Sequence, residues 1–195
     1  MKYFIVGLHG SGMREILETL KQLGVRCGKL FSDIDEPEDK FYGSADYEIF
    51  ATKDINEIFE NNAYIFIQRI NLYGKCFYEG LSQYEFDNND VFVLSPDQLS
   101  SSALSNVQEP YSFVWIDNTK LNRYNRFIDE KREYNFMQRE EQETQDLSYF
   151  VSLIYDKNVP VLYFNNEDPQ RIATVVYSLI KHPDLLDVYK QSFNN

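Results

Sequence analysis

Four short runs of apolar residues recur along the chain. They cover residues 3–6, 90–94, 112–116 and 159–164, and polar positions are rare within them. Runs of this kind are typical of strands that are buried on both faces of a parallel sheet. Segments with apolar residues three and four positions apart follow the runs. The pattern therefore predicts an α/β fold, in which helices flank a parallel sheet and a ligand site lies at the carboxyl ends of its strands.

The spacing of apolar residues between the runs predicts four helices. The first helix, from Met13 to Leu23, ends at Gly24, a residue type that commonly stops helices. Its buried face is expected to carry Ile16, Leu17, Leu20 and Leu23. The other helices begin at a proline or at a side chain that can cap the first turn. They run from Pro96 to Leu104, from a cap at Asp117 or Asn118 through Leu121, Tyr124 and Phe127, and from Asp168-Pro169 to Ile180.

Two segments depart from this alternation. Residues 31–82 contain alternating aromatic stretches such as 47–50 and 64–67, which predict an inserted lobe of mixed β-structure. Residues 1–30 and 83–195 then form the core. Within this core, residues 130–146 are strongly polar and mixed in charge, so we expect an exposed helical hairpin or lid there.

A glycine-rich loop follows the first apolar run. Gly7, Gly10 and Gly12 have the spacing that lets successive backbone N–H groups turn toward a phosphate, between a strand and a helix. Phosphate-binding loops of this type also carry a lysine for the outer phosphates and a Ser or Thr for magnesium, but Met13 and Arg14 occupy those positions. The loop therefore predicts phosphate binding without the charge neutralisation that phosphoryl transfer requires.

The order of these parts resembles the guanylate kinase family of P-loop nucleoside monophosphate kinases over nearly the whole chain. The resemblance rests on the loop 7–12, on 46–59 and 64–68 in the lobe, on Gly74 and Phe77-Tyr78, and on Asn165-Asn166 after the last run. Gln68 stands where the family has the acidic residue that reads the guanine edge. The segment 33–39 keeps the proline of the acceptor-phosphate clamp but has acids in place of both arginines. Acids repel a phosphate, so GMP is not expected to be the natural acceptor.

The resemblance implies a donor site, an acceptor site and a charged lid, with ATP and Mg²⁺ as cofactors. The implied donor site comprises Gly7, His9, Gly10, Ser11, Gly12, Met13, Asn165 and Asn166. The implied acceptor site comprises Tyr47, Gln68, Tyr78 and Asp97. Arg132 and Arg139 on the lid, with Arg14 as a substitute for the missing lysine, would supply the catalytic positive charge. No side chain is assigned as a metal ligand.

A dense basic stretch surrounds the predicted lid and allows two interpretations. Its members are Lys120, Arg123, Arg126, Lys131, Arg132 and Arg139. It is either a donor-phosphate lid or a solvated helix face. In the second case the charges are balanced by Asp129, Glu130, Glu133 and Glu140.

Charge and composition exclude several classes of partner. The net charge of −12 and the isoelectric point near 4.6 make duplex nucleic acid an unsuitable partner. No stretch approaches the length of uninterrupted apolar residues that a membrane span needs, so we expect a soluble, cytoplasmic protein. Cys27 and Cys76 are too few for a disulfide framework, and we expect two buried, reduced thiols.

Three functions from different classes are consistent with these features. The first is a guanylate-kinase-like protein that binds a nucleotide or small phosphorylated ligand but is weak or inactive as a GMP kinase. The second is an active phosphotransferase with a non-GMP acceptor. The third is a catalytically silent scaffold that holds a protein partner in the lobe cleft. Loss of the loop lysine, the hydroxyl and the clamp arginines together favours the first and third functions over the second. Retention of Tyr47, the lid arginines and the three loop glycines favours nucleotide binding, and so the first function.

Overall fold

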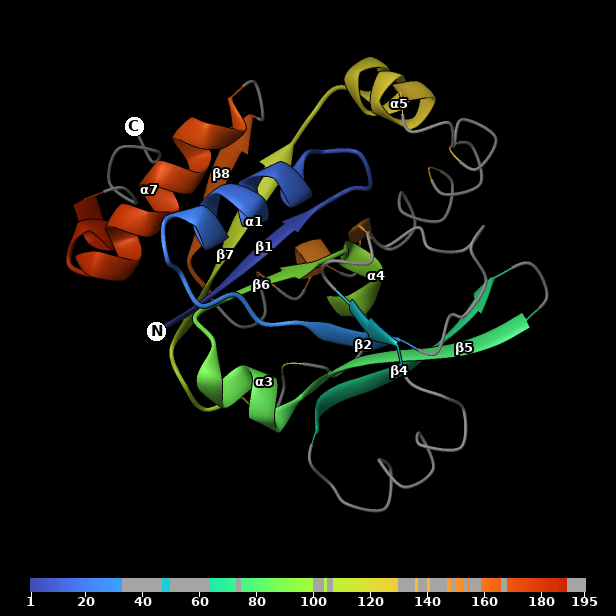
Figure 1. Cartoon of the computed structure of the whole chain (residues 1–195), viewed down its shortest axis with the longest axis horizontal. Coiled ribbons are helices and arrows are strands. Elements are labelled where there is room, and N and C mark those ends of the chain that lie inside the picture. The colour runs from blue at the N-terminus through green and yellow to red at the C-terminus, as the bar shows by residue number, and fades with distance from the viewer. Residues whose placement is uncertain are drawn as a thin grey trace.

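Two four-stranded sheets form the frame of this chain in the computed structural model (Figure 1). The structure describes residues 1–32, 47–49, 64–72, 75–99, 104, 107–129, 136, 140, 147–148, 150–152, 154, 159–165 and 168–188. One sheet is parallel and carries the glycine loop, and the other is mixed and belongs to residues 30–82. The predicted α/β class with an added mixed-β lobe is confirmed.

The parallel sheet contains all four predicted strands in the order β6-β1-β7-β8. Its strands are β1 (Lys2–Gly7), β6 (Val91–Leu94), β7 (Tyr111–Asp117) and β8 (Val161–Asn165). Every pair of neighbours is parallel, and a single parallel bridge between Cys27 and Val91 extends the sheet beyond β6. All six residues of β1 are buried, as expected for a central strand with both faces covered. The glycine loop therefore begins at the carboxyl end of a central strand.

One face of this sheet is covered by α1 (Met13–Gln22) and α7 (Pro169–Lys181), which lie side by side (Figure 1). Ile5 and Ile116 from the sheet pack there with Leu17 of α1 and Val176 of α7. The expected apolar face of the first helix is confirmed except at Leu23. That residue follows the last turn as the helix cap, and its side chain is 42% exposed.

The opposite face packs against the lobe and against α3 (Gln83–Asn88). Phe4 lies among the sheet's aromatic residues, with ring centroids 5.4 Å from Phe92 and 6.1 Å from Phe113. Leu81 of the lobe and Phe86 of α3 belong to the same buried cluster. The lobe and the parallel sheet therefore share one hydrophobic core, which fixes the lobe's inner face relative to the sheet.

The lobe's sheet has the strand order β3-β2-β5-β4. Its strands are β2 (Leu30–Ser32), β3 (Tyr47–Ile49), β4 (Tyr64–Leu72) and β5 (Lys75–Ser82). β2 is parallel to β3 and antiparallel to β5, and β4 and β5 form an antiparallel hairpin. In the hairpin, Phe66 of β4 and its register partner Leu81 of β5 are buried in the core that the lobe shares with the parallel sheet.

α4 and α5 follow β6 and β7, and α5 differs from its predicted form. α4 (Pro96–Leu99) begins where the sequence predicts, and the expected continuation to Leu104 stays a prediction because residues 100–103 lie outside the described chain. α5 spans Lys120–Asp129, and its first turn is capped by the Thr119 hydroxyl, which accepts a hydrogen bond from the Asn122 amide at 3.2 Å, rather than by Asp117 or Asn118. Of the three residues expected to form its apolar face, Leu121 is exposed and Tyr124 is only partly covered. Phe127 is buried as expected, and the other buried side chain of α5 is Arg123.

Candidate functional site

The glycine loop joins β1 to α1 and turns sharply enough to require glycine. Gly10 has a φ of +78°, a backbone conformation that side chains with a Cβ rarely adopt. A Cβ at Gly7 would lie 2.8 Å from the backbone oxygen of Ile116 on β7 and 2.5 Å from the Ser11 hydroxyl oxygen. Within the loop, the Ser11 amide donates to the Leu8 carbonyl at 3.0 Å. The loop thus folds tightly against the end of the sheet.

The first helix begins at this loop without a side-chain cap. Gly12 is its N-cap residue, with a φ of +97° and no side chain to accept a hydrogen bond. By contrast, α3 is capped by Ser82 and α7 by Asp168, whose side chains accept the first-turn amides. Uncapped N–H groups at a helix start, together with the positive end of the helix dipole, favour an anion.

The two residues that replace the lysine and the hydroxyl bring no cation into the loop. The Met13 sulfur lies 3.3 Å from the position of a Cβ at Gly7, and the side chain packs against the core beside α1. The Arg14 side chain is exposed, and its Nε donates to Glu18 Oε1 at 3.0 Å, one turn further along the helix. The structure therefore does not bring Arg14 to the loop that it was expected to serve.

α5 packs directly on the outer side of the loop, which reaches toward it in Figure 1. A Cβ at Gly10 would lie 3.0 Å from the backbone oxygen of Arg123 and 3.1 Å from the Phe127 ring. The Arg123 guanidinium donates from Nη1 to the His9 carbonyl at 3.3 Å. The loop is therefore held by both the backbone and a side chain of this helix.

Arg123 is a buried cation with a carboxylate partner from the predicted lid segment. Its side chain is 3% exposed and forms a hydrogen-bonded ion pair with Glu140, which also lies 3.7 Å from the Lys120 ammonium. Phe136 is buried against the same helix, with its ring 5.6 Å from the Arg123 guanidinium carbon and 5.1 Å from the Phe127 ring. At Arg123 the interpretation as a solvated helix face is wrong, because this side chain shares the buried face with Phe127 one turn away.

The carboxyl ends of β7 and β8 form the neighbouring part of this edge. Asp117 and Asn165 are register partners at the last position of each strand, and the Asn165 side chain is exposed. The Tyr163 hydroxyl donates to Asp117 Oδ2. This hydrogen bond to a carboxylate raises the pKa of Tyr163 to about 12, and partial burial adds to the effect. Asn165 therefore lies at the same sheet edge as the glycine loop, beside an acidic group that the sequence analysis did not assign to the site.

The lobe's hairpin separates two of the expected acceptor residues. Gln68 pairs in register with Glu79, and its side-chain amide donates to the Glu79 carboxylate, which is fully buried. Gln68 shares a face with the core residue Phe66, two positions away. Tyr78 is one residue from Glu79 and so lies on the opposite face of the hairpin. The structure thus brings Gln68 to the face that meets the core and adds Glu79, but it does not bring Tyr78 there.

Several expected site residues are described in part or not at all. Tyr47 lies in β3 and Asp97 in α4, and the structure describes only their backbone. Arg132, Arg139 and Asn166 lie outside the described residues, as does the acidic segment 33–39. Their roles stay predictions.

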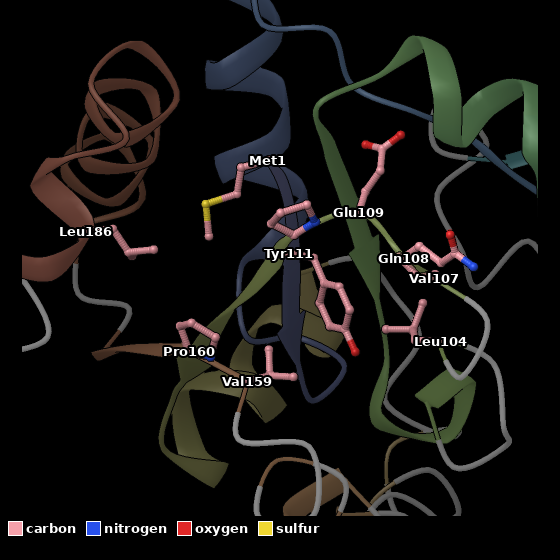
Figure 2. A pocket seen from close by; sticks show the side chains of 10 residues that line it. Met1, Leu104, Val107, Gln108, Glu109, Tyr111, Val159, Pro160 and Leu186 are labelled. Atoms are coloured by element: carbon pink, nitrogen blue, oxygen red, sulfur yellow. The ribbon is translucent and has the colours of Figure 1, made fainter.

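A cavity of about 410 Å³ opens at the other end of the parallel sheet (Figure 2). It is lined by Met1 before β1, Tyr111 at the start of β7, Pro160 before β8, and Leu186 after α7. These are the amino ends of parallel strands, whereas the glycine loop follows a carboxyl end. The cavity shares no residue with the loop and is separate from the candidate site.

Three further observations concern metal binding, the cysteines and membrane spans. Among the described residues, no group of three or more His, Cys, Asp or Glu side chains is placed to hold a metal ion. Cys27 is partly buried, but Cys76 is exposed, so the expectation of two buried thiols is wrong for Cys76, which lies on the hairpin's outer face. No helix in the described ranges is both long and apolar enough to cross a membrane.

Comparisons with known proteins identify a similar fold among solved structures. No family model matches the chain, and no curated protein matches it by sequence. Among solved structures, the guanylate kinase from Anaplasma phagocytophilum is similar, with a TM-score of 0.52 at 13% sequence identity. The match covers 93% of this chain and 84% of that one. The chain therefore has a guanylate-kinase-like fold.

Proposed function

We propose that the chain binds a nucleotide or another small phosphorylated ligand at the glycine loop and is weak or inactive as a phosphotransferase. The observation that carries this proposal is the start of α1 at Gly12, without a side-chain cap, directly after a buried central strand of the parallel sheet. Backbone amides at such a place bind phosphate oxygens without needing a charged side chain.

The weak activity follows from the chemistry that the loop lacks. Met13 presents a thioether where a lysine would neutralise the charge that develops on the transferred phosphoryl group, and each lost contact of this kind costs orders of magnitude in rate. Arg14 stands in place of the hydroxyl that would contact magnesium, and a guanidinium does not ligate a cation. Among the described residues the loop therefore does not fit a Mg²⁺ ion, and the proposed binding does not depend on one.

The test is calorimetric titration of the purified protein with ATP and with GMP, each with and without magnesium, at low salt. We expect ATP to bind with little dependence on magnesium, and Gly12→Ala to abolish binding because the loop cannot keep its conformation. Gly24→Ala is the matched control, since Gly24 also has a positive φ but lies past the far end of α1. Absence of binding by both nucleotides would contradict the proposal and favour the scaffold function.

Activity on an acceptor other than GMP is a second candidate, supported by the pair formed by Gln68 and Glu79. The buried Glu79 carboxylate holds the partly exposed Gln68 carboxamide, which offers a base edge both a donor and an acceptor where an acid offers acceptors alone. A phosphotransfer assay across nucleoside monophosphates tests this candidate. We expect one nucleoside monophosphate to be preferred, and Glu79→Gln to change which one is preferred. Absence of turnover with every acceptor would contradict this candidate function.

A further inference from the structure

Glu140 places a carboxylate between two cations beside the glycine loop. It forms an ion pair with the Arg123 guanidinium and lies 3.7 Å from the Lys120 ammonium. Arg123 is 3% exposed, Glu140 is 18% exposed and Lys120 is 58% exposed. The group therefore runs from the interior, at the loop, out to solvent, so an anion can approach it from the Lys120 side.

The buried end of this group touches the loop itself. Arg123 donates to the His9 carbonyl at 3.3 Å, and its backbone oxygen lies 3.0 Å from the position of a Cβ at Gly10. The loop has no cation of its own at Met13. Arg123 is therefore a cation in direct contact with the loop, and Glu140 links it to Lys120.

A guanidinium removed from water needs an anionic partner, and a carboxylate and a phosphate meet this need through the same two-pronged geometry. A phosphate group carries more charge than a carboxylate and offers three oxygens. A polyphosphate that is held by the loop amides and extends toward α5 would bring such a group to the Lys120 side of this ion pair. It would then compete with Glu140 for the same donors.

We propose that Glu140 is an internal competitor that occupies the phosphate-binding cations Arg123 and Lys120, and that a di- or triphosphate ligand displaces it. This inference rests on the proposed binding at the glycine loop and names the side chains that complete it. Competition by Glu140 predicts a different change in polyphosphate affinity from a purely structural role of this residue. Removing the Glu140 charge strengthens polyphosphate binding if Glu140 competes, and weakens or spares it if Glu140 only holds Arg123 in place.

The experiment is calorimetric titration of the full chain with inorganic tripolyphosphate and with ATP, for the wild type and Glu140→Gln. We expect the variant to bind both about tenfold more tightly, a size typical of coupling between sites. Glu109→Gln is the matched control, because it makes the same change in net charge at the cavity on the other edge of the sheet. An equal gain in both variants would overturn the inference as a general charge effect.

Lys120→Met provides a second variant whose folding is not in question, since Lys120 is exposed. We expect it to weaken tripolyphosphate binding several-fold, and an unchanged affinity would overturn the inference even if Glu140→Gln did not fold. If the wild type binds ATP but Glu140→Gln binds no more tightly, the inference fails and the proposed function stands. If neither protein binds either ligand, both fail.

Discussion

The guanidinium of Arg123 donates a hydrogen bond to the backbone carbonyl of His9 across 3.3 Å, which fastens α5 to the outside of the glycine loop. This contact joins residues 114 positions apart in the sequence. It makes the loop's conformation depend on the helix that follows the carboxyl end of β7, and it connects the predicted lid to the loop through Glu140.

Replacing Arg123 with methionine should destabilise the protein far more than replacing Arg126, three residues along the same helix. Arg123 is buried and bonded to both His9 and Glu140, so its loss leaves a largely buried carboxylate and costs about 2–4 kcal/mol. Arg126 forms a more exposed ion pair with Glu15 at 3.2 Å without hydrogen-bond geometry, so Arg126→Met should cost under about 1 kcal/mol. Urea unfolding of both variants measures the difference, and equal costs would contradict the described packing.

Gly10→Ala and Gly24→Ala separate backbone strain from packing. Both glycines have a φ near +78°, so each alanine should cost about 1–2 kcal/mol of strain. Nothing lies within 4 Å of a Cβ at Gly24, whereas one at Gly10 meets the Arg123 backbone and the Phe127 ring. We therefore expect Gly10→Ala to cost about 1–3 kcal/mol more than Gly24→Ala in thermal or urea unfolding. Similar values for the two would mean that α5 does not press on the loop.

Met13→Lys should strengthen ATP binding by about tenfold, because it restores a cation where the phosphate-binding loop requires one. The lysine stem can replace the methionine against the core while its ammonium reaches the ligand. Gln22→Lys, at the exposed last turn of α1, adds the same charge and should leave the affinity unchanged. Calorimetric titration with ATP measures the affinity of both variants. A gain shared by the control would point to net charge, and no gain in Met13→Lys would argue that the loop does not cradle phosphates.

Tyr163 should titrate near pH 12, because its hydroxyl donates to the Asp117 carboxylate. The folded state then holds this proton more tightly than the unfolded chain, where tyrosine titrates near 10. The resulting stability is present below pH 10 and is lost as the pH rises from 10 through 12. The ring NMR signals that disappear in Tyr163→Phe identify the residue. In Asp117→Asn the midpoint should fall toward 10, and an unchanged midpoint would contradict the hydrogen bond.

The apolar pattern predicted the core strands and the helix ends correctly, because these depend on residues that are close together in the sequence. The four runs became the four strands of the parallel sheet, and Asp168-Pro169 and Gly24 mark the start of α7 and the end of α1 as expected. Arg123 shows where this reasoning stops. The sequence left it as part of a phosphate lid or of a solvated helix face, and neither interpretation predicted its burial. The ion pair with Glu140, which no local pattern reveals, makes that burial acceptable.

The sequence by itself determined that the chain is an α/β protein with a glycine loop at the end of its first strand and no lysine in it. Both properties are local, since they follow from residue type and spacing. The tertiary structure alone decided that α5 lies against this loop, that Glu79 stands beside Gln68, and that Asp117 meets Tyr163. Each of these contacts joins separate strands or helices, whose relative positions are set by the packing of a shared core.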